Sequence, residues 1–256
     1  MIDLRIDDDV ATVVLDGPDK LNALDEQAVR DLDAAYAAAE AAGVRALMLR
    51  GEGRVFCAGR DISGVDPRTD DVPAYLDRLV TPLLQRMAAF PAPTFAAAHG
   101  ACLGVGLGLL IATDVVYVAD TAKIGSPFAA LGATLDSGGH ALLYERLGAH
   151  RTLDLIYTGR LMTGDEAVAA GLFSRVLPAD RVRAATEAAA SAAAAGPTAA
   201  FVASKRLIAD LRDRRTGLWD SMGAENAAQA ALCDTDDYRE GFAAFQAKRP
   251  PHFTGR

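Results

Sequence analysis

The sequence predicts an α/β protein with a parallel sheet in its core and an all-helical region behind it. Short aliphatic and β-branched runs at residues 10–15 and 44–49 flank an alanine-rich helical pattern at 25–43. Strand, helix and strand in this order form the crossover unit of a parallel sheet. From Asp180 onward, alanine-rich helical patterns follow one another without another convincing strand. With 256 residues, 51% of them hydrophobic, the chain can bury a large core.

Local start and stop signals place the individual elements. Asp25 can cap the first helix, and Gly43 can end it in a left-handed conformation. A second helical pattern at 72–90 stops at Pro91. The polar, proline-containing residues 64–73 predict an exposed loop. Further strands are expected at residues 94–98, 115–118 and about 172–177.

Composition argues against several classes of function. Lys and Arg total 26 against 34 Asp and Glu, and the net charge of -8 opposes binding to nucleic acid or to an anionic membrane surface. The glycine-rich apolar stretch at 101–112 is shorter than the roughly 20 residues of a membrane-spanning helix, and the acidic N-terminus lacks a signal-peptide pattern. The three cysteines are widely spaced and the four histidines lack ligand spacing, so neither disulfides nor a metal site is expected. A reducing cytoplasm is the expected location.

Two segments could aim backbone N–H groups at one point. Residues 57–62 (CAGRDI) and 99–106 (HGACLGVG) each follow an apolar run and open into a helical pattern. The first N–H groups of a helix have no internal partner and carry the positive end of its dipole. Two such donors from separate segments can hold an oxyanion, which is a large contribution in acyl and enolate catalysis. The glycines at 104–108 have neither dinucleotide-binding nor P-loop spacing.

These segments belong to a wider set of motifs. The others are residues 18–24 (PDKLNAL), 124–127 (IGSP) and 241–253 (GFAAFQAKRPPHF). In this order, and over nearly the whole chain, the set resembles the crotonase (enoyl-CoA hydratase/isomerase) superfamily. The resemblance implies a ClpP/crotonase-like ββα-spiral core that binds CoA thioesters at residues 1–179 and a helical oligomerisation region at 180–256. It also implies a homotrimer or a dimer of trimers.

The resemblance further implies a set of site residues. The backbone N–H groups of Ala58 and Val105 would form the oxyanion hole, although the family usually has glycine at the second position. Coenzyme A would enter as part of the substrate, and no tightly bound cofactor is expected. The residues expected to contact the CoA thioester are Lys20, Ala23, Leu24, Ala58, Asp61, Ile62, Gly104, Phe128 and Lys248.

The proton-transfer positions depart from the hydratase pattern. The two glutamates that resembling hydratases use to add water fall on Gly108 and Phe128, neither of which can move a proton. The remaining carboxylate is Asp136, whose position resembles the catalytic aspartate of isomerase-type members, most of all the ring-1,2-epoxyphenylacetyl-CoA isomerase branch. Asp136 also precedes a helical pattern that ends at Gly148, so its side chain could instead be a helix N-cap.

Taken with this resemblance, the lone carboxylate favours an enoyl-CoA isomerase that shifts a double bond within a CoA thioester. One base can take a proton from C2 of a 3-enoyl thioester and return it to C4, while the oxyanion hole holds the enolate. The apolar neighbours Leu131 and Leu135 should raise the pKa of Asp136, and His140 could tune it. Two alternatives stay open. One is a non-catalytic acyl-CoA binding protein in which Asp136 only caps a helix, and the other is a hydratase with reduced activity.

Overall fold

A mixed six-stranded sheet forms the centre of the core. The computed structural model describes residues 2–66, 68–214 and 217–256. β1 pairs with β2 in an antiparallel hairpin, and every other neighbouring pair in this sheet is parallel. In spatial order the strands are β1 (Ile2–Asp7), β2 (Val10–Leu15), β3 (Ala46–Gly51), β4 (Thr94–Ala98), β6 (Val115–Ala119) and β8 (Arg175–Leu177). The central strands β3 and β4 are wholly buried because helices cover both faces of the sheet.

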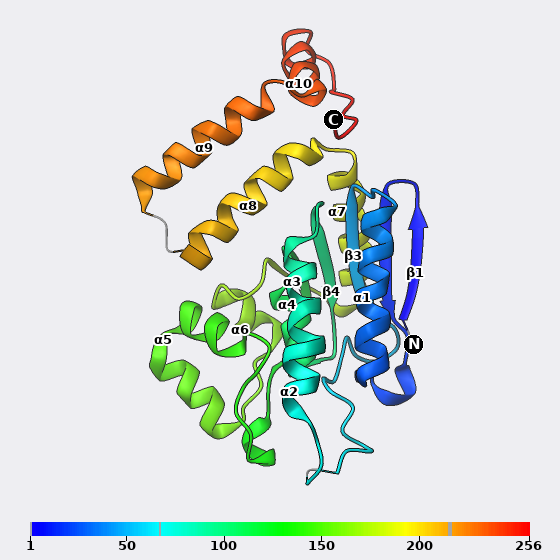
Figure 1. Cartoon of the computed structure of the whole chain (residues 1–256), viewed down its shortest axis with the longest axis vertical. Helices are drawn as coiled ribbons and strands as arrows, with labels where there is room; N and C mark the ends of the chain where they lie inside the picture. Colours follow the sequence, from blue (N-terminus) through cyan, green and yellow to red (C-terminus); the bar gives the residue numbers. More distant parts are fainter. Residues whose placement is uncertain (1, 67, 215–216) are drawn as a thin grey trace.

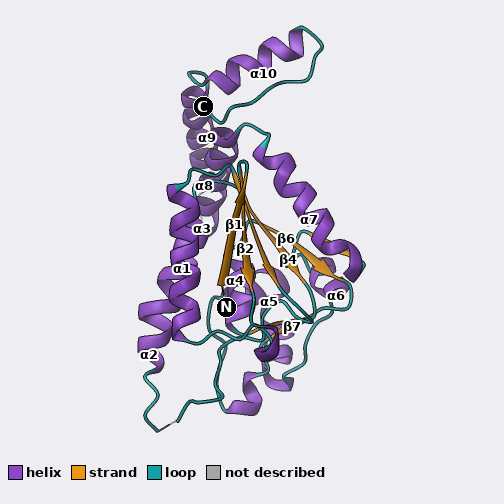
Figure 2. Ribbon diagram, turned by 90° about the vertical axis from the view of Figure 1, so that its right-hand side faces the viewer, coloured by secondary structure: helices purple, strands orange, loops and turns teal. Residues whose placement is uncertain are grey.

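Those helices flank the sheet in two layers, with α1 and α3 on one side and α7 on the other (Figure 2). They are α1 (Glu26–Ala41), α2 (Val72–Tyr75), α3 (Thr81–Ala89) and α7 (Ala179–Ala194). The Asp25 side chain caps α1 by accepting the Ala28 N–H at 2.8 Å, as predicted. A π-helical turn at Leu76–Val80 joins α2 to α3, so the predicted helix at 72–90 is confirmed as one nearly continuous element.

A smaller sheet forms a second layer beyond the ends of these strands. It consists of β5 (Ala101–Leu103) and β7 (Lys123–Gly125), which pair in parallel. Two isolated β-bridges extend this layer, because the backbone of Cys57 pairs with that of Cys102 and the backbone of Met162 pairs with that of Ile124. β4 leads into β5 and then α4 (Val105–Ile111), and β6 leads into β7 in the same way. This repetition is the ββα spiral that the resemblance implies.

The segment after β7 returns towards α4. It contains a 3₁₀ turn at Phe128–Leu131, α5 (Gly139–Thr158) and α6 (Gly164–Ala169). α5 consists of two helical pieces that meet at Gly148, whose φ of 72° is left-handed. Glycine adopts this conformation without a steric penalty, and the predicted helix end at this residue is confirmed.

Three helices project from the core as a C-terminal arm (Figure 1). They are α8 (Thr198–Arg214), α9 (Leu218–Leu232) and α10 (Asp236–Gln246). The preceding helix α7 falls in the helical region expected at 180–256, but it packs on β3, β4 and β6 through a narrow face of mostly small residues. The projecting part of the molecule therefore begins at α8, and α7 belongs with the core.

Polar side chains tie the arm to the core. Arg45, just before β3, donates to the Gly196 carbonyl at 2.6 Å and to the Phe253 carbonyl at 3.1 Å. Lys205 of α8 pairs with Asp114 at 2.9 Å. Among the described residues, no helix is both long enough and apolar enough to cross a membrane.

Candidate active site

The two glycine-containing motifs meet where the larger sheet passes into the second layer. The backbone of Cys57 pairs with that of Cys102 in β5 through an isolated parallel β-bridge, and both thiols are free. α4 begins directly after β5. Gly59 has a φ of 101°, and a Cβ at this residue would lie 2.9 Å from the Leu103 carbonyl oxygen. Only glycine permits this close approach of the two backbones. The sequence therefore places residues 57–59 against the N-terminal end of α4.

The Val105 N–H stands at the N-terminal end of a helix. Val105 is the first residue of α4, so its N–H has no acceptor within the helix. Its side chain is buried, with 1% of its surface exposed, and points away from solvent. The departure from glycine at this position therefore leaves the backbone donor intact.

The Ala58 N–H has an acceptor within the chain. It donates to the Leu21 carbonyl at 3.0 Å. Leu21 and Asn22 both have left-handed φ angles, of 55° and 54°. The buried Asn22 side chain anchors this turn by donating to three backbone carbonyls, including that of Val55 at 2.9 Å. For Ala58 to act as an oxyanion donor, its acceptor must change from Leu21 to the ligand.

Asp136 lies between the buried Leu135 and the half-buried Ser137. Its Oδ1 atom is buried, and no described residue forms a hydrogen bond with it. Burial raises the pKa of this carboxyl, against the opposing effects of the Ser137 hydroxyl and the positive charge of Arg60. The direction agrees with the effect expected from apolar neighbours, and it makes Asp136 a stronger base than an exposed aspartate.

The helix-cap interpretation of Asp136 is wrong. The N-cap of α5 is Gly138, in a left-handed conformation, and no side chain caps the helix. Gly139 donates its N–H to the backbone carbonyl of Asp136 at 2.9 Å, and the carboxylate takes no part. The Nε2 atom of His140 lies 3.3 Å from the Thr134 hydroxyl oxygen, and these two atoms form a hydrogen bond. The Asp136 carboxylate is thus not used to stabilise the helix.

The two positions at which the resemblance places the hydratase glutamates have other surroundings. A Cβ added at Gly108 would lie 2.5 Å from the Cβ of Ser137, so the residue after Asp136 occupies the space that a side chain would need. The Phe128 ring packs against the Gly104 backbone, with ring carbons 3.0 and 3.2 Å from the position of an added Cβ. Neither position carries a carboxylate.

The residues expected to bind CoA at the N-terminal end lie together. Leu24 donates its N–H to the Gly59 carbonyl at 2.8 Å and accepts from the Asp61 N–H at 3.0 Å, which joins the two motifs. Lys20 pairs with Asp61 at 2.7 Å, and this pair raises the pKa of Lys20 and lowers that of Asp61. The adjacent Ala23 is half-buried. The Ile62 side chain, 51% exposed, leaves an apolar surface next to this pair.

Lys248 lies away from this group within one chain. It follows α10 at the end of the arm, with a left-handed φ of 51°, and its side chain is exposed. Figures 1 and 2 both place α10 at the opposite end of the molecule from α2.

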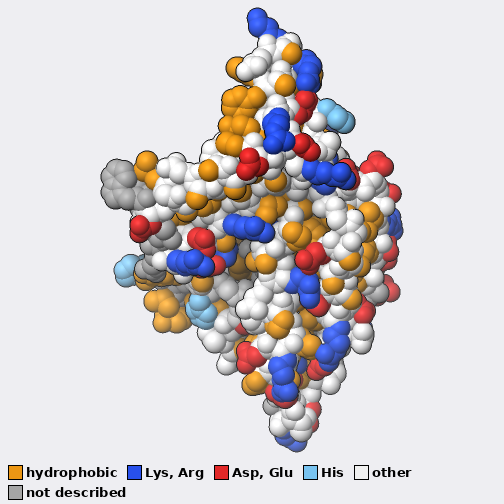
Figure 3. Space-filling view, turned by 45° about the horizontal axis from the view of Figure 1, so that its top comes forward, with side chains coloured by type: hydrophobic (Ala, Val, Ile, Leu, Met, Phe, Trp, Pro, Cys, Tyr) orange, Lys and Arg blue, Asp and Glu red, His pale blue; other side chains and the backbone are white. Residues whose placement is uncertain are grey.

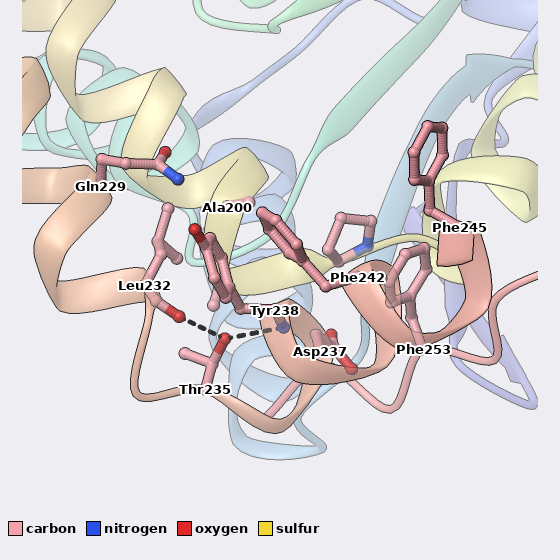
Figure 4. Close-up of a pocket in the computed structure, with 12 residues that line it drawn as sticks. Ala200, Gln229, Leu232, Thr235, Asp237, Tyr238, Phe242, Phe245 and Phe253 are labelled. Atoms are coloured by element: carbon pink, nitrogen blue, oxygen red, sulfur yellow. Dashed lines mark hydrogen bonds between the residues drawn. The ribbon is translucent and has the colours of Figure 1, made fainter. Parts of the chain in front are cut away.

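A pocket of about 490 Å³ lies on the arm, where Tyr238, Phe242 and Phe253 line it (Figure 4).

Sequence reasoning missed a cluster of three residues, namely Arg60, Asp70 and Tyr75. Arg60 forms a two-pronged ion pair with Asp70, and its guanidinium lies 4.2 Å from the centre of the Tyr75 ring. Arg60 stands inside the CAGRDI motif, and this position is the one signal for it in the sequence.

Among the described residues, no cluster of three histidine, cysteine or acidic side chains could hold a metal ion.

Comparisons with known proteins agree with this architecture. The family described as enoyl-CoA hydratase/isomerase matches residues 5–256. A "Probable enoyl-CoA hydratase" of Rhodobacter capsulatus is 34% identical over 98% of this chain and 97% of its own. The 1,2-epoxyphenylacetyl-CoA isomerase of Escherichia coli is 31% identical over 98% of this chain and 97% of its own.

Solved structures share the whole fold. An enoyl-CoA hydratase/carnithine racemase from Magnetospirillum magneticum superposes with a TM-score of 0.88 and 34% identity, over 100% of this chain and 96% of that one. An enoyl-CoA hydratase from Bacillus anthracis gives a TM-score of 0.90 and 26% identity, over 100% and 99%. The predicted crotonase fold is confirmed. The chain belongs to the enoyl-CoA hydratase/isomerase family.

Proposed function

We propose that this protein is an enoyl-CoA isomerase in which Asp136 is the acid/base residue. The observation that carries the proposal is the Asp136 carboxylate itself, which has a buried oxygen that no described residue hydrogen-bonds and a raised pKa. A buried carboxylate oxygen without a hydrogen-bond partner is costly, and such groups are typical of functional sites.

The reaction needs one proton carrier and one anion site. The Asp136 carboxylate takes a proton from C2 of a 3-enoyl thioester, and the electron pair of that C–H bond moves into an enolate on the thioester oxygen. The Val105 N–H and, after it leaves Leu21, the Ala58 N–H stabilise the enolate oxygen. The proton then returns from Asp136 to C4, which leaves the double bond between C2 and C3. No water is consumed.

Hydration is the less favoured reaction at this site. It requires a base to activate water and an acid to deliver a proton, and each group typically contributes about 10² to 10⁴ in rate. Gly108 and Phe128 supply neither group, and Ser137 blocks a side chain at the first of these positions. Several relatives are named as hydratases. The two glutamates that the resemblance assigns to hydration fall on Gly108 and Phe128 in this chain, which supports the proposal of an isomerase.

The second candidate is an acyl-CoA binding protein without turnover. The bond from the Ala58 N–H to the Leu21 carbonyl favours it, because one proposed oxyanion donor is already satisfied. The unused Asp136 carboxylate argues against it, since a protein that only binds has no need to bury an ionisable group.

One set of assays separates these possibilities. The purified protein is incubated with 3-enoyl-CoA of several chain lengths, and conjugation to the 2-enoyl thioester is followed by absorbance. Hydration of 2-enoyl-CoA is measured in parallel, and binding is measured by calorimetry. We expect isomerisation with poor hydration. Brisk hydration without isomerisation, or binding without turnover at every chain length, would contradict the proposal.

A further inference from the structure

Residues 252–256, called the strap below, fold back over the start of α10. Asp237, in the first turn of that helix, is buried, with 3% of its surface exposed. Its carboxylate accepts the Thr254 N–H at 2.7 Å and the Gly255 N–H at 2.8 Å. Its own backbone N–H donates to the Arg256 carbonyl at 2.9 Å. The strap is thus bonded to the arm along most of its length.

The strap also contacts the core through Arg45. The guanidinium of this residue donates to the Phe253 carbonyl at 3.1 Å, to the Gly196 carbonyl at 2.6 Å and to the Thr198 hydroxyl at 3.2 Å. Gly255 has a left-handed φ of 84°, and a Cβ added there would lie 3.0 Å from the Arg45 Nε atom. One cation of the core therefore holds both the strap and the residues at which α8 begins.

The strap supplies the hydrogen bonds of a buried charge. Among the described residues, the donors to the Asp237 carboxylate are Thr254, through its N–H and its hydroxyl, and the Gly255 N–H. A buried carboxylate that loses its donors pays the full cost of its desolvation. The strap is therefore held in place more firmly than an exposed segment of the same length.

The strap joins the far end of the arm to the core. The chain enters the arm at Gly196, and α8, α9 and α10 then project away from the sheet (Figure 1). The strap follows α10, yet its Phe253 carbonyl accepts from Arg45, which lies 208 residues away in the sequence. Parts of a chain that meet through a limited polar interface are expected to move relative to each other. A second attachment restrains such movement.

We propose that the strap is a conformational device that holds the arm at a fixed angle to the core, with Arg45 and Asp237 as its two anchoring side chains. Release of the strap frees the arm to swing about its remaining attachments, one of which is the ion pair between Lys205 of α8 and Asp114. The device acts whether or not Asp136 is a catalytic base.

The test is the distance between two spin labels, measured by pulsed electron paramagnetic resonance. One label is attached to Cys233, an exposed thiol after α9, and the other to Ala38→Cys at an exposed position of α1. Cys57 and Cys102 are buried and remain unlabelled. Labelled protein is diluted with an excess of unlabelled protein, so that the signal reports distances within one chain. The protein with the intact strap should give one narrow distribution.

Removing either anchor should broaden that distribution. In Asp237→Ala the Thr254 and Gly255 amides should exchange with solvent at least about tenfold faster, because they lose a charged acceptor. The label distances should spread in the same variant and in Arg45→Met. A chain shortened after Pro251 lacks the strap but keeps both anchors, and it should show the same spread.

Asp236→Ala is the matched control. Asp236 precedes Asp237 in the same helical turn, but its carboxylate is exposed and pairs with Arg239 at 3.0 Å, so the narrow distribution should persist. Circular dichroism checks that each variant keeps its helices. A narrow distribution in the shortened chain, or faster amide exchange in Asp237→Ala without any spread of the label distances, would overturn the inference. Equal spread in Asp236→Ala would overturn it as well, because the effect would then not depend on the strap.

Discussion

Burial is the largest influence on the ionisation of the Asp136 carboxyl. Its Oδ1 atom has no hydrogen-bond partner among the described residues. Burial raises the pKa of the carboxyl above its ordinary value of 3.8. The same shift affects both rate and stability, because a protonated Asp136 cannot act as a base and an ionised one is costly to bury. These two effects can be measured separately.

The rate should fall at acidic pH as Asp136 becomes protonated. We expect kcat/KM for 3-enoyl-CoA to decrease with a single acid limb whose midpoint lies above 3.8, the ordinary aspartate value. The measurement is a pH profile under conditions in which circular dichroism shows the fold to be intact. A flat profile down to pH 4 would show that no carboxyl with a raised pKa takes part.

The contribution of Asp136 to the stability of the folded protein should be larger at acidic pH, where the rate falls. Between the unfolded and folded pKa values of Asp136 the folded protein binds more protons, so its stability decreases as pH rises through this window. Above the window, Asp136→Asn removes the buried charge. The melting temperature of the variant at pH 7 should equal that of the wild type or exceed it by about 1 to 4 °C. A variant that is several degrees less stable at pH 7 would contradict this account.

At the scale of elements, the contact between α4 and the segment before α5 leaves no room for a side chain at Gly108, where the resemblance places a hydratase glutamate. The two segments touch where Gly108 faces Ser137, and Ser137 has a left-handed φ of 50°. This conformation is unusual for serine and is maintained by the surrounding packing. The shape of the site is thus set by the path of a loop as well as by the absence of a glutamate.

Adding one methyl group at Gly108 should therefore destabilise the fold. In Gly108→Ala the new Cβ would lie 2.5 Å from the Ser137 Cβ, and overpacking of this kind typically costs about 1 to 3 kcal/mol, which exceeds the gain in helix propensity of about 1 kcal/mol. Gly223→Ala is the matched control, because nothing lies within 4 Å of that helical position. Urea unfolding should show a lower free energy of unfolding for the first variant and an equal or higher one for the second.

A second substitution tests the cause of that loss. Ser137→Gly removes the Cβ that blocks Gly108 and suits the left-handed conformation, so the double variant with Gly108→Ala should recover part of the lost stability. If Gly108→Ala is as stable as Gly223→Ala, or if Ser137→Gly gives no recovery, the contact does not restrict the site.

Long periodic elements could be predicted from the sequence, whereas contacts between loops could not. The helix at 25–43 and the strands at 10–15 and 94–98 carry strong local patterns and appear as expected. β5 and β7 have three residues each, and their pairing depends on tertiary structure. The resemblance singled out Asp136 as a candidate. Nothing local indicated that the Ala58 N–H would donate to the Leu21 carbonyl, because this bond depends on how an anchored turn folds back.

At the scale of the whole molecule, the arm exposes apolar side chains far from the core (Figure 3). Phe245 of α10 is 84% exposed and Phe242 is 54% exposed. Helices of this kind gain most of their stability from packing. We therefore predict that the arm packs against other copies of the chain, in a trimer or a dimer of trimers, and that Lys248 meets a CoA site on a neighbouring copy.

Sedimentation at micromolar concentration tests the assembly. The wild type should sediment as a trimer or hexamer, and Phe245→Asp should shift the distribution towards smaller species because it places a charge in an apolar contact. Phe245→Tyr keeps the ring and serves as the control. A wild-type protein that sediments only as a monomer would refute this prediction.

The rate of Asp136→Asn on a 3-enoyl-CoA is the most direct test of the central claim. Asparagine keeps the size of the side chain but cannot accept the C2 proton, so isomerisation should fall by at least about 10²-fold while thioester binding is little changed. Asp165→Asn, at an exposed carboxylate on α6, is the matched control and should keep the wild-type rate. Full isomerase activity in folded Asp136→Asn would show that this carboxylate is not the base.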